Sequence, residues 1–125
     1  MAHNMYWEHE GVYWQYYGYV SGKEVIETST SIYSDQRFDT LKYKLADFLG
    51  AASVEIDEEE VALVAYQHRS VERSNPYIKT AIVMKPADIE LGNKFASFFI
   101  ESFWDVRVFQ EMDEANKWLG RNPPS

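Results

Sequence analysis

Cysteine is missing from this chain of 125 residues. Disulfides, thiolate nucleophiles and cysteine-ligated zinc sites are therefore excluded. Long apolar runs are missing too, because the longest, FASFFI (95–100), is far below the roughly 20 residues that span a bilayer. The opening MAHNMYWEHE has neither the basic segment nor the apolar segment of a signal peptide. We therefore expect a cytoplasmic protein.

Positive charge is scarce. The chain has 12 Lys and Arg residues against 20 Asp and Glu residues, which gives a net charge of −8. A nucleic-acid partner requires a basic surface, so we expect none. Peripheral contact with a membrane is an alternative that this acidic charge does not favour, because anionic lipid attracts Lys and Arg.

Aromatic residues, by contrast, are abundant at 16% of the chain, and they are concentrated at its start. Two aromatic segments, MYWEHE (5–10) and VYWQYYGYV (12–20), predict a β-hairpin whose strands meet at Gly11. Alternation along the second segment places Trp14 and Tyr16 on one face. The other face carries Tyr13, Tyr17 and Tyr19.

Tyrosine-rich surface is typical of protein interfaces, because the ring is apolar while the hydroxyl stays hydrated. Helices are expected to cover only one face of the sheet that contains this hairpin. We therefore expect a homodimer whose contact includes Tyr13, Tyr17 and Tyr19.

Helical and strand patterns alternate through the rest of the chain. The predicted elements are a helix within 21–35, a strand at 41–48, a loop at 49–56, a helix at 58–73, a strand at 77–84, a helix at 88–103, a strand at 104–109 and a helix at 112–120. Alternation of strands and helices implies right-handed crossovers and a mainly parallel sheet. The predicted fold class is α/β, with a mixed five-stranded sheet, an N-terminal hairpin and about four helices. We expect a single domain, 1–125, with its core in 5–119 and frayed ends at 1–4 and 120–125.

The strand at 41–48 ends in an acid on its apolar face. Alternation places Leu41, Tyr43, Leu45 and Asp47 on one face and Lys42, Lys44 and Phe48 on the other. The carboxyl ends of strands are where open α/β sheets bind ligands, but a carboxylate at that place also caps the backbone of a loop. We expect Asp47 to organise the loop at 49–56 and to serve recognition second, beside Phe48, without a catalytic role.

No catalytic or metal motif is present in the sequence. His68 falls on the apolar face of the helix at 58–73, and a catalytic histidine needs a nucleophile or an orienting acid within reach. No nucleophile motif supplies one, so a buried histidine bonded to a backbone carbonyl is favoured over a general base. On a strand, Glu8 and Glu10 share one face and His9 takes the other, so the three do not converge on a metal. We expect no enzyme activity, no cofactor and no metal.

The helix at 88–103 carries four phenylalanines at helical spacing: Phe95, Phe98, Phe99 and Phe103. Core packing against the sheet is the usual role of such a stripe, and a lid over an apolar pocket is the alternative. An interfacial helix would need Lys and Arg on its polar face, and Glu90 and Glu101 lie there instead.

Several motifs resemble, in their order and spacing, the SpoIIAA-like family of small bacterial proteins. They are the aromatic hairpin, I-Y-S-D (32–35), R-F-D-x-L-x-Y-x-L-x-D-F (37–48), S-N-P (74–76), W-x-V-R-V-F (104–109) and E-A-x-x-W-L (114–119). That family is related to the STAS domain of anti-sigma-factor antagonists and to the lipid-carrying SEC14/CRAL-TRIO fold. The resemblance covers about residues 5–119 and implies a βα superhelix with helices packed on a mixed sheet.

The resemblance also implies a place for a phosphorylated serine. In anti-sigma-factor antagonists, a partner kinase modifies a serine at the start of the helix that follows the central strand. The matching stretch here, DFLGAASVEID (47–57), lacks the Asp-Ser-Ser-Gly type of site, and Ser53 is a loose positional match. Its acidic neighbours in 55–60 disfavour an added phosphate.

Two functions are therefore expected. The first is a non-enzymatic regulatory or interaction module of STAS type, in which Asp47, Phe48 and Ser53 face an unknown protein partner. The second is a carrier or sensor of an apolar or lipid-like small molecule, with a mobile helix at 88–103 whose phenylalanines contact the ligand. A closed, fully packed helix favours the first function, and an apolar cavity beneath it favours the second.

Overall fold

A computed structural model describes residues 3–122 and contains one five-stranded sheet in the order β1-β2-β3-β4-β5. The strands are β1 (His3–Glu8), β2 (Gly11–Ser21), β3 (Tyr43–Glu55), β4 (Lys79–Val83) and β5 (Asp105–Phe109). The helices are α1 (Gly22–Thr30), α2 (Glu58–Ser70), α3 (Ile89–Ser97) and α4 (Met112–Leu119), with short 3-10 turns at Gln36–Thr40, Glu72–Ser74 and Pro86–Asp88. β1 and β2 are antiparallel, and every other pair is parallel. The predicted fold class is confirmed.

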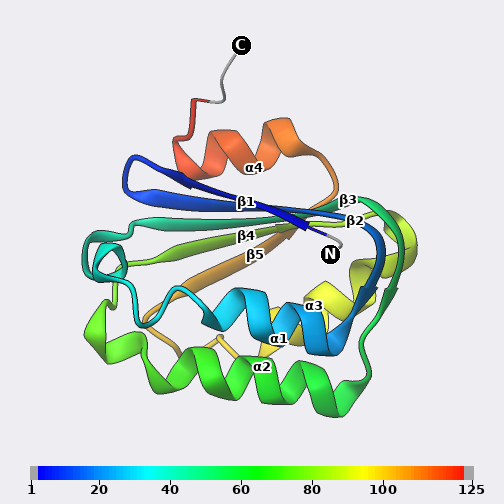
Figure 1. Cartoon of the computed structure of the whole chain (residues 1–125), viewed down its shortest axis with the longest axis horizontal. Coiled ribbons are helices and arrows are strands. Elements are labelled where there is room, and N and C mark those ends of the chain that lie inside the picture. Colours follow the sequence, from blue (N-terminus) through cyan, green and yellow to red (C-terminus); the bar gives the residue numbers. More distant parts are fainter. Residues whose placement is uncertain (1–2, 123–125) are drawn as a thin grey trace.

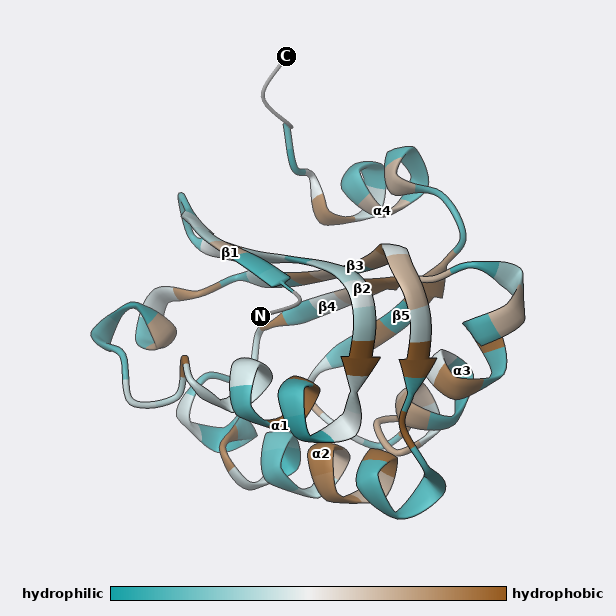
Figure 2. Cartoon of the chain, turned by 45° about the vertical axis from the view of Figure 1, so that its right-hand side comes forward, coloured by the Kyte–Doolittle hydropathy of each residue, from teal (hydrophilic) through white to brown (hydrophobic). Residues whose placement is uncertain are grey.

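The sheet separates two layers of helices. α1, α2 and α3 cover one face, and α4 alone covers the other (Figure 1). α4 is largely hydrophilic (Figure 2), whereas four of the five residues of β4, at the interior of the sheet, are buried. The larger core lies beneath α1, α2 and α3, and a smaller one, built on Leu45, Ala81, Val83 and Ala115, lies beneath α4.

The turn of the first hairpin lies two residues earlier than predicted. Glu8 pairs with Gly11, so His9 and Glu10 form the turn, and Gly11 is the first residue of β2. Glu10 adopts a left-handed backbone with φ of 57°. A side chain at position 11 would run into the ring of Tyr43, which explains the glycine there.

β3 is longer than predicted, because the expected loop at 49–56 continues as strand to Glu55. Pairing with β2 resumes at Gly50, opposite Tyr17, and runs to Glu55. β2 and β3 thus extend past the end of β4 and curve toward α1 and α2 (Figure 1). Small residues at 50–53 have low strand propensity, but pairing with a neighbouring strand overrides that preference.

α3 is shorter than predicted and ends at Ser97 rather than at 103. The chain then turns so that Trp104 enters the core, where its indole N–H donates to the Asn75 carbonyl at 2.6 Å. The Asn75 amide in turn donates to the carbonyls of Phe38 (2.8 Å) and Leu41 (2.7 Å). These buried bonds favour the turn over further helix.

Residues near both chain ends form part of the fold: positions 3–4 belong to β1, and positions 120–121 end α4 and bind the first hairpin. His3 and Asn4 form part of β1, and Gly120 ends α4 with φ of 70°, as predicted for a glycine cap. The buried Arg121 makes two hydrogen bonds of 2.7 Å to Glu8 and holds the pKa of that carboxyl below its usual value. Residues 1–2 and 123–125 lie outside the described part of the chain.

Candidate functional site

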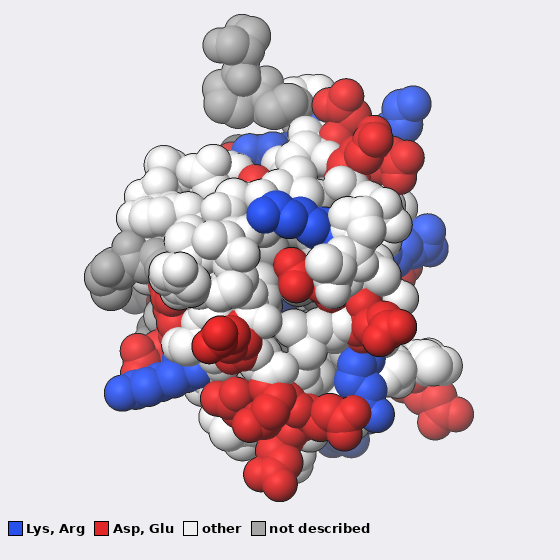
Figure 3. All heavy atoms as spheres, turned by 90° about the vertical axis from the view of Figure 1, so that its right-hand side faces the viewer, with Lys and Arg blue, Asp and Glu red and all other residues white. Residues whose placement is uncertain are grey.

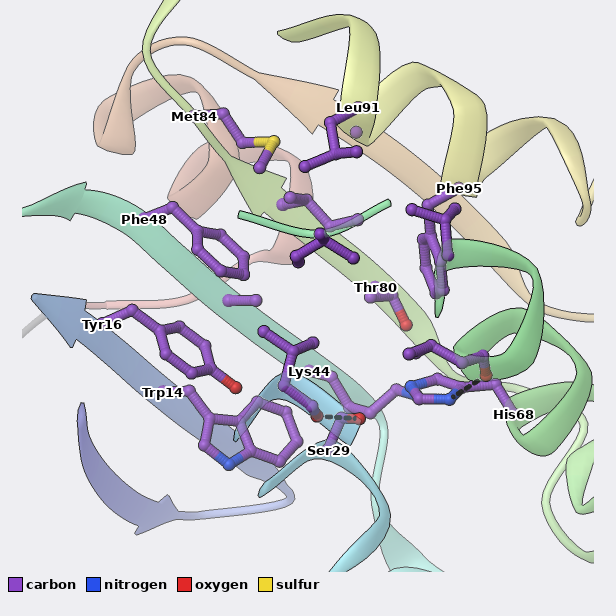
Figure 4. Close-up of a pocket in the computed structure, with 17 residues that line it drawn as sticks. Trp14, Tyr16, Ser29, Lys44, Phe48, His68, Thr80, Met84, Leu91 and Phe95 are labelled. Atoms are coloured by element: carbon purple, nitrogen blue, oxygen red, sulfur yellow. Dashed lines mark hydrogen bonds between the residues drawn. The ribbon is translucent and has the colours of Figure 1, made fainter. Parts of the chain in front are cut away.

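A cavity of about 80 Å³ lies between the sheet and the helices α1, α2 and α3. We call it the α3 cavity, because Leu91, Gly92 and Phe95 of α3 form one side of it, while His68 of α2 forms another (Figure 4). The sheet side is formed by Trp14 and Tyr16 from β2, Lys44, Ala46 and Phe48 from β3, and Thr80, Ile82 and Met84 from the β4 region. The α3 cavity is mostly apolar, with a few polar groups among its lining residues.

Lys44 is the ionisable amine of the α3 cavity. The strand register places it between Val12 of β2 and Thr80 of β4, and only 1% of the residue is exposed. The alternation predicts Lys44 on the face opposite the apolar one, and this second face is buried as well, because helices cover both faces of the sheet. Among residues 3–122 its Nζ has no hydrogen-bond partner, and it lies 4.2 Å from the centroid of the Trp104 ring. Burial lowers the pKa of Lys44 to about 7, so amine and ammonium coexist at neutral pH.

Three more donors near Lys44 are unpaired. Within the described residues, the Trp14 Nε1, the Thr80 hydroxyl and the Tyr33 hydroxyl are buried without a partner. Trp14 and Thr80 line the α3 cavity, while the Tyr33 ring lies 5.7 Å from Nζ of Lys44. Each buried polar group left unpaired costs about 1–3 kcal/mol. The α3 cavity therefore has an excess of hydrogen-bond donors.

His68 is buried and bonded to a backbone carbonyl, as predicted. Its Nδ1 lies 2.8 Å from the Val64 carbonyl oxygen, which makes Nδ1 the protonated nitrogen. Burial, and next the positive charge of Lys44, lower the pKa of His68 well below its ordinary value, although the bond to Val64 opposes this. The ring stands edge-on to Tyr33 and Phe95. His68 therefore acts as a neutral aromatic side of the α3 cavity.

Asp47 lies on the opposite face of the sheet, beneath α4. Its Oδ1 accepts from the Leu49 amide at 2.9 Å, and its Oδ2 accepts from the Tyr13 hydroxyl at 3.0 Å. Asp47 therefore organises the backbone, but of a continuing strand and not of the predicted loop. Phe48 points the other way, into the α3 cavity, and stacks on Tyr16 at 4.5 Å. A role of Asp47 in recognition stays a prediction.

The four predicted phenylalanines do not act together. Phe95 lines the α3 cavity, whereas Phe99 is buried against Trp104 and Phe98 is half-buried beside it. Phe103 lies beyond α3 and is 68% exposed. Phe103 is not part of the apolar face of α3, because the helix ends at Ser97.

Gly92 brings α3 close to the sheet. A Cβ at this position would lie 2.8 Å from Sδ of Met84 and 3.1 Å from Cγ1 of Val108. A side chain here would meet Met84 and Val108, so glycine allows the close approach of α3 to the sheet.

Ser53 lies within β3, opposite Tyr19, and not in a loop at the start of a helix. Its hydroxyl is buried and, among residues 3–122, has no partner. Acidic side chains gather on the face seen in Figure 3, and the first turn of α2 carries three of them. A phosphate at Ser53 would need to displace buried structure and to approach this negative surface.

The three tyrosines of the predicted dimer contact differ in exposure. Tyr13 is half-buried, because its hydroxyl bonds to Asp47 and its ring lies 4.8 Å from the Arg121 guanidinium. Tyr17 and Tyr19 are 43% and 80% exposed. The dimer contact therefore stays a prediction for Tyr17 and Tyr19, and Tyr13 serves the interior of the fold.

Within residues 3–122, no group of three His, Asp or Glu side chains is arranged to hold a metal ion. In the same part of the chain, no helix has both the length and the apolar character to cross a membrane.

The fold belongs to the SpoIIAA-like class of α/β folds. The chain is similar to the crystal structure of an uncharacterized protein of the DUF3478 family, with a SpoIIAA-like fold, from Shewanella loihica PV-4. The match covers 94% of this chain and 92% of that one, with a TM-score of 0.53 and 12% sequence identity. At this identity the likeness establishes the fold alone, and it confirms the fold that the sequence motifs imply. No protein-family model matches the sequence, and no curated protein matches it.

Lys44, Thr80 and Trp14 are the site residues that sequence reasoning missed. A signal for them exists in the nearly continuous apolar strand at 77–84, which indicates a sheet covered on both faces. A parallel neighbour of such a strand has no solvent-facing side. The lysine in its alternating pattern must then be buried.

Proposed function

We propose that this protein is a small-molecule sensor or carrier and that the α3 cavity is its ligand site. The α3 cavity supports the proposal, because small-molecule sites are concave, mostly apolar and supplied with a few placed polar groups. Protein interiors are otherwise close-packed. A void beside a buried lysine is therefore best explained by an occupant.

The size of the α3 cavity limits that occupant. A void of about 150 Å³ accepts benzene, and the α3 cavity measures about 80 Å³. A short-chain molecule fits this space far better than a full lipid does. A lipid-like ligand would require α3 to move away from the sheet, against the close contact at Gly92.

Contact with a protein partner is the second candidate function. Ile100 and Phe103 are 82% and 68% exposed in the segment that directly follows α3. A protein partner that covered this segment would remove both apolar side chains from water. This segment continues from α3, which borders the α3 cavity. We therefore expect that a ligand in the cavity changes the position of Ile100 and Phe103.

The experiment combines native mass spectrometry with a variant that fills the α3 cavity. The mass of freshly purified protein is measured under native conditions. The protein is then denatured, and any small molecule that it releases is identified by its mass. Short alcohols from ethanol to butanol are next titrated into isotope-labelled protein and followed by NMR. Ala46→Leu places a larger side chain in the α3 cavity, and Ala52→Leu is its control, because Ala52 lies exposed on the same strand.

We expect the wild type and Ala52→Leu to bind a short alcohol, with shifts centred on Phe48 and Phe95, and Ala46→Leu to bind none. Equal binding by Ala46→Leu would place the ligand elsewhere. Failure of every small apolar probe, with no molecule released from purified protein, would overturn the proposed function.

A further inference from the structure

We propose that the natural ligand of the α3 cavity is a small monocarboxylate, held by an ion pair with Lys44 and by a hydrogen bond from Thr80. The inference rests on the proposed function and specifies its chemical class. It predicts a charged head group at the sheet and a short apolar tail toward Phe95 and Leu91.

The register of three neighbouring strands brings the donors to one face. Lys44 and Thr80 are direct partners across β3 and β4, and adjacent strands lie about 4.8 Å apart. Trp14 is the partner of Ala46, which lies two residues along β3 on the same face as Lys44. All three side chains line the α3 cavity (Figure 4). One carboxylate, with two oxygens and about four lone-pair directions, has acceptors for both the ammonium of Lys44 and the hydroxyl of Thr80, which are neighbours across β3 and β4.

Lys44 differs from the other buried cation of the fold. Arg121 is paired with Glu8 through two hydrogen bonds of 2.7 Å. Lys44 faces the ring of Trp104, and this cation–π attraction offsets part of the cost of burying the ammonium. The cost of an unpaired ammonium in the interior is larger than this attraction. A carboxylate from a ligand would supply the missing counterion.

The groups that face Lys44 carry no negative charge at neutral pH. They are the neutral imidazole of His68 from α2, the Tyr33 phenol after α1, the hydroxyl of Thr80 and the indole of Trp104. A single ammonium among neutral groups matches a monoanion, whereas a phosphate dianion would leave one buried charge without a partner. The limited volume of the α3 cavity also favours the smaller carboxylate.

Carboxylate binding would be coupled to proton uptake. A bound anion raises the pKa of Lys44 from about 7, so the neutral amine gains a proton when the ligand binds above that pH. If the pKa in the complex exceeds 9, the affinity falls about 50-fold between pH 7 and pH 9. A neutral ligand would show no such dependence.

The acidic surface acts on the rate of binding. The chain carries a net charge of −8, and acidic side chains gather near the start of α2 (Figure 3). This surface repels an approaching anion over long distances. At physiological ionic strength, salt screens this repulsion beyond about 8 Å. The association rate of a carboxylate should therefore rise with salt.

The test compares acids and alcohols of equal chain length. Acetate, propanoate and butanoate are titrated beside ethanol, propanol and butanol into wild type, Lys44→Met and Lys42→Met by calorimetry at pH 7, 8 and 9. Two buffers of different ionisation enthalpy report the protons taken up. Lys42→Met is the matched control, because Lys42 lies just before β3 and is exposed. Circular dichroism checks that each variant is folded.

In the wild type and in Lys42→Met, we expect the acids to bind at least tenfold more tightly than the alcohols at pH 7, with proton uptake at pH 8. Lys44→Met should lose this preference and the proton uptake while it still binds the alcohols. Equal affinity for acids and alcohols in the wild type would overturn the carboxylate assignment and leave the proposed function standing. If a folded Lys44→Met binds neither acids nor alcohols, Lys44 maintains the shape of the cavity and does not select the carboxylate. That result would also overturn the carboxylate assignment. No binding of either class by wild type would overturn the proposed function itself.

Discussion

Replacement of Lys44 by methionine should stabilise the ligand-free protein and flatten its pH dependence. In the folded protein, burial lowers the pKa of Lys44 to about 7, whereas a lysine in an unfolded chain has a pKa of about 10.4. Between these values the unfolded state binds more protons than the folded state. The free energy of unfolding therefore rises with pH across this window, and below about pH 7 the dependence disappears because both states are protonated.

The magnitude follows from the two pKa values. A full proton difference changes the free energy of unfolding by about 1.36 kcal/mol per pH unit, and the slope is smaller near pH 7, where the folded lysine is half protonated. The expected gain from pH 7 to pH 9 is about 2 kcal/mol. For a chain of this length, that gain raises the melting temperature by roughly 8 °C.

Urea denaturation at pH 7, 8 and 9 measures this gain directly. The wild type and Lys42→Met should each gain about 2 kcal/mol, while Lys44→Met should be flat and more stable than both at pH 7. His68 titrates below this window, and the tyrosines with raised pKa titrate above it. A flat wild type, or a slope that survives in Lys44→Met, would refute the reasoning that the amine of Lys44 is desolvated.

Three further predictions concern the rest of the fold. Asp47→Ala should destabilise the protein by about 2 kcal/mol in urea, because two hydrogen bonds are lost, and should leave ligand titrations unchanged, because Asp47 faces α4. Asn75→Ala should cost about 2–3 kcal/mol in thermal unfolding, since two buried carbonyls lose their donor; a cost below about 0.5 kcal/mol would contradict this. Tyr19→Ser should shift the predicted homodimer toward monomer in sedimentation equilibrium, and a wild type that is already monomeric at micromolar concentration would reject the dimer.

The order of elements could be predicted from the sequence because it depends on local patterns. The capping box that begins α2 joins Asp57 and Glu60, and Gly120 ends α4 in a left-handed conformation. Both signals lie within a few residues of the helix end that they define. The same locality explains the correct strand at 77–84.

The errors lie where distant residues decide the structure. The stretch at 49–56 looks like a loop by composition, but β2 offers it a partner strand. α3 ends early because Trp104 reaches the distant Asn75. Neither contact leaves a periodic signal in the sequence.

The site was predictable only in part, for a related reason. The helical stripe at 88–103 predicts a ligand contact for Phe95, whereas Phe48 is predicted to face a protein partner and lies in the α3 cavity instead. Lys44 is charged, and charged residues are almost never fully buried without a partner. Its place in the α3 cavity follows from helices on both faces of the sheet, which the apolar strand at 77–84 indicates and the alternating pattern of β3 itself does not. A functional residue that breaks a local rule is the kind that local reasoning misses.

The bond between Glu8 and Arg121 has a consequence for the lifetime of the folded state. The two residues are 113 positions apart, so their contact closes a loop that contains most of the chain. Closing so long a loop costs conformational entropy, and this cost comes before the contact stabilises the fold. It forms only after the first hairpin and α4 are both in place, which makes it a late event in folding. We expect Arg121→Ala to accelerate unfolding severalfold while the folding rate changes little. This pairing of the two ends therefore governs how long the native state persists, and not how quickly it is reached.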